Sequence, residues 1–138
     1  MNASNDSGES LALRIFRGLL VFNMCTIGVM HFVVPETFMA IMPDYLPWHR
    51  ELVLVSGVFE ILGGVGVAIP RTRKAAGWGL IALMICVFPA NLWQATQGID
   101  LPGLAGPAWA RWARLPMQLV FIYWAYAVTQ PRKARAEG

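Results

Sequence analysis

The chain has 138 residues, of which 57% are hydrophobic and only 14% are charged, and its mean hydropathy is +0.51. A soluble domain of this length needs a more polar exterior, so the composition excludes an ordinary soluble protein and predicts a chain solvated by lipid. The formal net charge of +3 is modest, and the sequence has no basic stripe interleaved with aromatic residues. Binding to DNA or RNA is therefore not expected.

Four apolar stretches approach the roughly 20 residues that a helix needs to cross a bilayer. We expect membrane spans at about residues 14–34, 52–69, 75–95 and 112–130, with disordered ends at 1–10 and 132–138. The apolar run of the fourth span, from Leu115 to about Thr129, is short, and we expect the span to begin earlier by using Trp109 and Trp112. The predicted fold is all-α, a single membrane domain over residues 1–138 built as a four-transmembrane-helix bundle.

Basic residues indicate how this bundle is oriented. If the spans alternate in direction, eight of the eleven Lys and Arg residues share one side, and only Arg50, Arg111 and Arg114 lie on the other. The eight are Arg14, Arg17, Arg71, Arg73, Lys74, Arg132, Lys133 and Arg135. The positive-inside bias then places both termini in the cytoplasm and the longer first and third loops outside.

The first outer loop is more than a linker. It places Phe38, Ile41 and Met42 between Pro35 and Pro43. Apolar residues between turn-forming prolines predict a short interfacial helix that caps the outer end of the bundle.

Glu60 is the only acidic side chain inside the predicted spans. A carboxyl near the middle of a bilayer is costly, which makes it a functional-site hypothesis by default. At 1.5 Å per residue it lies about 13 Å below Glu51, at the outer end of its span. Ser56, Glu60, Gly63 and Gly64 share one helical face, which we expect to point into the bundle because small residues allow close helix packing.

The other polar side chains of the spans also favour the outer half. The ligand-binding or proton-linked candidates are Glu60, His31, Asn91, Gln94, Gln118 and Arg114. Polar groups without partners are expensive in hydrocarbon, so we expect these side chains to converge in a polar vestibule open to the outer side.

The alternative is that these side chains are hydrogen-bond links between helices, which is the interpretation we favour for Asn91, Gln94 and Gln118. For Glu60, a ligand, proton or partner role and a structural pair with His31 or Arg114 both stay open. No residue is indicated as catalytic. The histidines have no further nitrogen or sulfur ligands nearby, so no metal centre is predicted.

Several motifs together carry a family resemblance. They are Gly28-Val29-Met30-His31-Phe32 followed by Pro35, Ser56-Gly57-Val58-Phe59-Glu60-Ile61-Leu62-Gly63-Gly64, Pro70-Arg71-Thr72-Arg73, and Val87-Phe88-Pro89-Ala90-Asn91. The chain resembles the DoxX-like family of small bacterial membrane proteins. The family takes its name from a subunit of a thiosulfate:quinone oxidoreductase. The resemblance implies a four-helix protein of the bacterial inner (plasma) membrane that is linked to redox chemistry.

The function expected from this resemblance is that of an accessory membrane subunit of a redox system, whose vestibule binds quinone or docks a redox partner protein. One alternative is a non-catalytic binder or scaffold for a small hydrophobic ligand, a lipid or a partner helix. A proton-coupled small-molecule exporter is a third hypothesis, and it would require a homo-oligomer. The sequence does not assign the protein an enzymatic activity.

Overall fold

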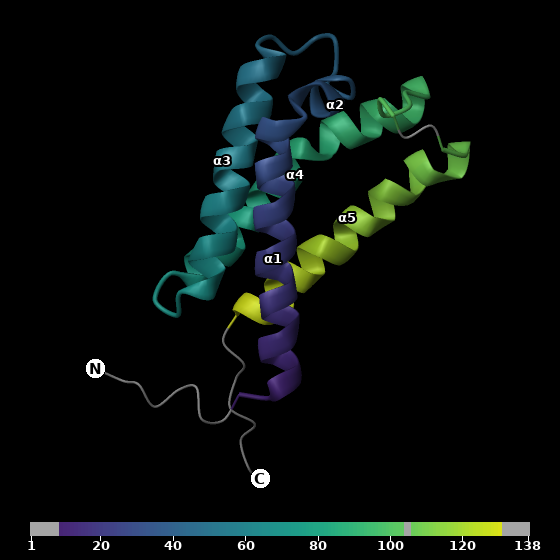
Figure 1. The fold of residues 1–138 in the computed structure, drawn as a ribbon. Coiled ribbons are helices and arrows are strands. Elements are labelled where there is room, and N and C mark those ends of the chain that lie inside the picture. Colours follow the sequence, from purple (N-terminus) through teal and green to yellow (C-terminus); the bar gives the residue numbers. More distant parts are fainter. Residues whose placement is uncertain (1–8, 104–105, 131–138) are drawn as a thin grey trace.

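The computed structural model describes residues 9–103 and 106–130, which form five helices and no strand (Figure 1). The helices are α1 (Leu11–Val33), α2 (Pro35–Met39), α3 (His49–Ala68), α4 (Arg73–Gln97) and α5 (Ala108–Thr129). The all-α prediction is confirmed. The expected disorder at 132–138, the basic residues there and most of the expected disordered start lie outside the described residues.

Three of the described helices, α1, α3 and α4, are long and apolar enough to cross a membrane, with 23, 20 and 25 residues. Helix α5 has 22 residues, but Arg111, Arg114 and Gln118 lower its hydropathy and it does not reach the same apolar character. Large apolar side chains face outward on the bundle, including Phe22 at 72% exposure and Ile85 at 59%. Such a surface suits lipid and not water, so these helices indicate a membrane protein.

The helix ends follow local chemistry, and they differ from the predicted span ends by up to four residues. Ser10 caps α1, because its hydroxyl accepts the Leu13 N–H at 3.3 Å. Gly98 follows the last residue of α4 as its C-cap, and its φ of 66° is the left-handed conformation that glycine adopts without strain. Pro107 immediately precedes α5, so Trp109 and Trp112 belong to this helix as expected, and it starts at Ala108 instead of residue 112.

Helices α1 and α3 lie side by side and form one pair (Figure 1). Helices α4 and α5 form a second pair, and α4 also packs against α3. The four long helices alternate in direction. Helix α5 is close to α1 where α1 begins and leans away from it toward the end that carries α2. The apolar core lies nearer the end of the bundle where α1 begins. It consists of Leu20, Met24, Val67, Leu80, Ile81, Met84, Ala125 and Val128.

The contact between α1 and α3 depends on two glycines that face each other. A Cβ at Gly28 would lie 2.9 Å from the carbonyl oxygen of Gly57, and a Cβ at Gly57 would lie 2.9 Å from that of Gly28. The Gly57 Cβ would also lie 2.7 Å from the Cβ of His31. Of the residues expected to face inward on α3, Gly64 is buried and Ser56, Glu60 and Gly63 are half-buried, while Val53, Gly57 and Val67 complete the buried face of this helix.

Arg17 ties α1 to α5 at the other end of the bundle. Its Nε donates to the carbonyl oxygen of Val128 at 3.0 Å, and its two terminal nitrogens donate to the two carboxylate oxygens of Glu9. Glu9 and Ser10 fall within the segment 1–10 that was expected to be disordered. The structure corrects this expectation for these two residues, because hydrogen bonds to α1 hold both of them.

We expect Gly57→Ala to lower the free energy of unfolding by about 1 to 3 kcal/mol, because the added methyl group must push α1 away from α3. The measurement is thermal or chemical unfolding of the purified protein in detergent. Gly79→Ala is the matched control, since a Cβ at Gly79 meets nothing within 4 Å and alanine favours a helix. Equal stability of the two variants would contradict a tight contact between α1 and α3.

Candidate functional site

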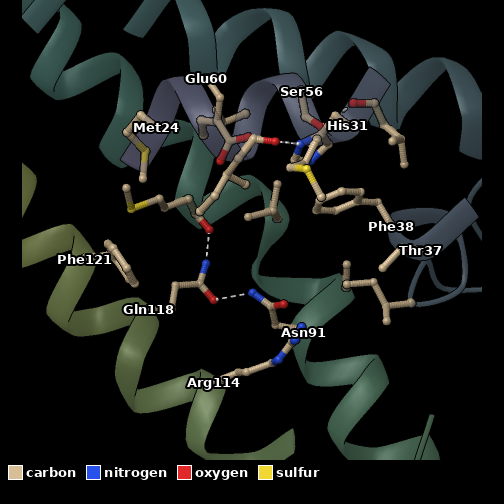
Figure 2. Close-up of a pocket in the computed structure, with 18 of the residues that line it drawn as sticks. Met24, His31, Thr37, Phe38, Ser56, Glu60, Asn91, Arg114, Gln118 and Phe121 are labelled. Atoms are coloured by element: carbon tan, nitrogen blue, oxygen red, sulfur yellow. Dashed lines mark hydrogen bonds and ion pairs between the residues drawn. The ribbon is translucent and has the colours of Figure 1, made fainter. Parts of the chain in front are cut away.

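A cavity of about 510 Å³ lies between the two helix pairs, toward the end that carries α2 (Figure 2). All five helices contribute to its wall, together with Leu101 from the segment between α4 and α5. The volume lies within the range of pockets that hold small molecules or cofactors. Most of the wall is apolar, and the residues Met24, Leu80 and Met84, which belong to the apolar core, form part of it.

Five of the six candidate residues predicted from the sequence line this cavity. They are His31 on α1, Glu60 on α3, Asn91 on α4, and Arg114 and Gln118 on α5. In Figure 2 His31, Ser56 and Glu60 lie on one side of the cavity, and Asn91, Arg114 and Gln118 lie on the opposite side. The polar groups therefore face one another across an apolar space.

Gln94 is the candidate that does not line the cavity. Its side chain is buried, with 2% of the residue exposed, and both ends of its amide are occupied. The oxygen accepts from Arg114 Nη1 at 3.1 Å, and the nitrogen donates to the carbonyl oxygen of Ile99 at 3.3 Å. Gln94 thus orients Arg114 from behind, while Arg114 itself reaches the wall.

Glu60 lies against His31, with 3.2 Å between Oε2 and the imidazole Nδ1 (Figure 2). The same nitrogen is 2.8 Å from the carbonyl oxygen of Ile27, one turn earlier on α1. A single N–H cannot point at both oxygens, and the Ile27 carbonyl has the better geometry. Oε2 of Glu60 is consequently buried without a well-aligned hydrogen bond from the described residues. Of the two partners proposed for Glu60, the structure places His31 beside it, whereas Arg114 binds Gln94.

An amide pair occupies the opposite wall. Asn91 Nδ2 donates to Gln118 Oε1 at 3.0 Å, and Gln118 Nε2 donates to the carbonyl oxygen of Met84. These bonds link α4 to α5, as expected of hydrogen-bond links between helices. Asn91 and Gln118 also line the cavity, and the bond to Gln118 uses one of the two N–H donors of the Asn91 amide.

Helix α2 covers the cavity from the end. The Phe38 ring stacks on the His31 imidazole with centroids 3.8 Å apart and an angle of 18° between the planes. Ile41, just beyond α2, is 8% exposed and also lines the cavity. The sequence predicted that this loop folds onto the bundle, but it gave no sign that Phe38 would meet His31.

Methionine is the part of the wall that sequence reasoning missed. Five of the seven methionines of the chain line the cavity: Met24, Met30, Met42, Met84 and Met117. They come from α1, α4, α5 and the segment after α2, so no local spacing could have grouped them. Flexible thioether side chains give the cavity a wall that can adapt to the shape of an apolar ligand.

The fold and this cavity define a small helical membrane protein with a mainly apolar pocket between its helices. Among the described residues, no group of three or more His, Cys, Asp and Glu side chains could hold a metal ion. The chain belongs to the family described as a domain of unknown function, DUF8561, whose model matches residues 20–129. That segment contains every residue that lines the cavity. No curated protein and no solved structure matches the chain.

We expect Phe38→Ala to speed amide hydrogen exchange in residues 35–42 by at least about tenfold, because the stack on His31 and the burial of the ring are both lost. Exchange is followed by mass spectrometry of the protein in detergent. Val33→Ala is the control, since Val33 lies beside this segment and is 65% exposed. If exchange in Phe38→Ala matches that of the parent, the segment is held by something other than this stack.

Proposed function

We propose that the protein binds a small amphipathic molecule inside the membrane and that a quinone is the ligand class, as expected of an accessory membrane subunit of a redox system. The observation that carries this proposal is the pair of polar walls facing each other across an apolar cavity of about 510 Å³. The DoxX-like resemblance supports the same ligand class.

A quinone ring carries oxygens at two opposite positions, and its body and tail are apolar. Asn91 and Arg114 supply donors on one wall, which suits a carbonyl oxygen of the ligand. Glu60 supplies an acceptor without an aligned donor on the other wall, which suits the hydroxyl group of a quinol. Phe121 and the methionines provide the apolar surface between them.

A non-catalytic binder of lipid or of another small hydrophobic ligand is the second candidate. The observation in its favour is the methionine-rich wall, because flexible side chains of this kind suit ligands of varied shape. The two candidates share the cavity, so the identity of the retained molecule separates them.

We also propose that α5 is a fourth span, that α2 lies at the membrane interface, and that the protein sits in the bacterial inner membrane with both termini in the cytoplasm. The described basic residues support this orientation. One cavity at the end where α1 begins is lined by Arg14, Arg17 and Arg73. Arg71 and Lys74 lie close to Arg73 in the sequence and therefore near the same end. Arg50 and Arg111 lie toward the end that carries α2.

We expect Ala90→Phe to weaken quinone binding by at least about tenfold, because Ala90 lines the cavity and a phenyl group would fill part of it. The probe is a short-chain benzoquinone titrated into the protein in detergent, with the dissociation constant measured by calorimetry. Ala82→Phe is the matched control, since Ala82 is exposed on α4 and does not line the cavity. Lipid retained in native mass spectrometry without quinone binding would favour the second candidate.

Glu60→Gln tests the polar wall in the same titration. The variant keeps the shape of the side chain and removes the carboxylate, so we expect normal folding and an affinity for the quinol form that is about 10- to 100-fold lower. If Glu60→Gln binds like the parent while Glu60→Leu only lowers stability, Glu60 is a structural link between α1 and α3 and the proposed ligand contact is wrong.

The proposed orientation predicts that a cysteine at Asp44 is labelled by an impermeant maleimide from outside the cell and that a cysteine at Thr72 is not. Both positions are exposed, and the tests use a background in which Cys25 and Cys86 are replaced by alanine. The reverse pattern would overturn the orientation. Labelling of both positions would contradict the proposal that α3, which lies between them in the chain, crosses the membrane.

A further inference from the structure

Two residues in the wall of the cavity of about 510 Å³ are also exposed on the outside of the bundle. They are Met30 on α1 and Met117 on α5, with 40% and 52% of each residue exposed. Every other described residue of the wall is buried or half-buried. A residue that lines a cavity and is also exposed lies at its rim, so the two methionines mark an opening.

The two methionines lie on the faces by which α1 and α5 approach each other. These helices meet where Trp124 Nε1 donates to the carbonyl oxygen of Phe16 at 3.1 Å. Met117 precedes Trp124 by about two helical turns, and Met30 follows Phe16 by about four, so each methionine shares a helix face with a residue of that contact. From there α5 leans away from α1 toward the end that carries α2 (Figure 1). The opening therefore lies at the side of the bundle, between α1 and α5.

The surroundings of this side opening are apolar. Val33 on α1 and Val120 on α5 lie within one turn of the two methionines and are 65% and 63% exposed. Trp112 is 51% exposed near the start of α5 and is of the residue type that marks a membrane interface. Met117 lies about 8 Å further along the helix. With α5 as the proposed fourth span, the side opening faces the hydrocarbon of the bilayer.

A quinone of a membrane has a polar head and a long isoprenoid tail. A cavity of about 510 Å³ is of the size that holds a drug-sized molecule, so it accommodates the head and only the first part of such a tail. Helix α2 covers the end of the cavity, where Phe38 stacks on His31. The rest of the tail needs an apolar exit, and flexible methionine side chains on both sides of the opening adapt to its shape.

We propose that a long-tailed quinone enters the cavity sideways from the bilayer, between α1 and α5. The head then lies between the polar walls, while the tail passes between Met30 and Met117 into the lipid. This inference rests on the quinone binding proposed above and narrows the ligand to quinones that carry an isoprenoid tail. A ligand without a tail makes no use of the side opening.

The test compares two benzoquinones that differ only in their tails, one short and one of several isoprene units. The full chain is placed in phosphatidylcholine nanodiscs, each quinone is added at a series of fractions of the lipid, and bound quinone is counted by native mass spectrometry. Comparing variant with parent at each tail length cancels the partition of the quinone into lipid. We expect Met117→Trp and Met30→Trp to weaken binding of the long-tailed quinone about tenfold more than that of the short-tailed one, because the indole narrows the opening.

Leu119→Trp is the matched control. Leu119 is 64% exposed, and because it is two residues from Met117 it lies on nearly the opposite face of α5. We expect this variant to treat the two quinones alike. Unchanged helical circular dichroism shows that each variant is folded.

The outcomes separate this inference from the proposed function. If Met117→Trp and Met30→Trp weaken both quinones equally, or if Leu119→Trp shows the same preference, the tail does not use the side opening although quinone binding stands. If the parent binds neither quinone, the proposed function is wrong and this inference falls with it. Retained phosphatidylcholine that Met117→Trp removes, in a parent that binds no long-tailed quinone, would assign the opening to a phospholipid chain instead.

Discussion

The close approach of α1 and α3 at Gly28 and Gly57 is the constraint on which the candidate site depends. Each glycine has the backbone oxygen of the other within 2.9 Å of where a side chain would begin, so neither helix can carry a larger residue there without moving. One turn after Gly28 comes His31, and one turn after Gly57 comes Glu60. The glycine contact therefore brings the imidazole and the carboxyl together. In a membrane, where lipid is as apolar as leucine, such packing is a main source of helix association.

The same contact leaves space elsewhere. Because α1 is bound closely to α3, and α5 touches α1 chiefly near Arg17 and Trp124, the two helix pairs separate toward the end that carries α2. Side chains from all five helices line this space without filling it. Helix α2 then covers it, with Phe38 lying on His31. The cavity thus follows from where the helices contact one another closely. Its polar groups lie in the region where the two helix pairs have separated.

The sequence predicted the elements well and the contacts less well. Apolar length located the four long helices, and the spacing of small residues identified the inward face of α3 with Glu60 beside it. Periodicity places a residue on a face, but the crossing and register of two helices decide what it meets. That is why Gln94 turned out to lie behind Arg114 instead of on the cavity wall. The grip of Arg17 on Glu9 was missed for a related reason, since the polar composition of residues 1–10 indicated disorder and concealed a cap.

The two ends of the bundle handle buried charge in opposite ways. Near the start of α1 the carboxylate of Glu9 has two donors from Arg17 and further arginines nearby, so its negative charge is well compensated. Near α2 the Nδ1 of His31 is taken by the carbonyl oxygen of Ile27, so Oε2 of Glu60 has no hydrogen-bond donor among the described residues. A buried acceptor without a partner lowers stability by about 1 to 3 kcal/mol. A fold that keeps such a group at the wall of a cavity, and not in its packed core, retains a position that a donor on a bound molecule can satisfy. This difference supports the proposed binding role of the Glu60 end, while the Arg17 and Glu9 pair holds α1 in place beside α5.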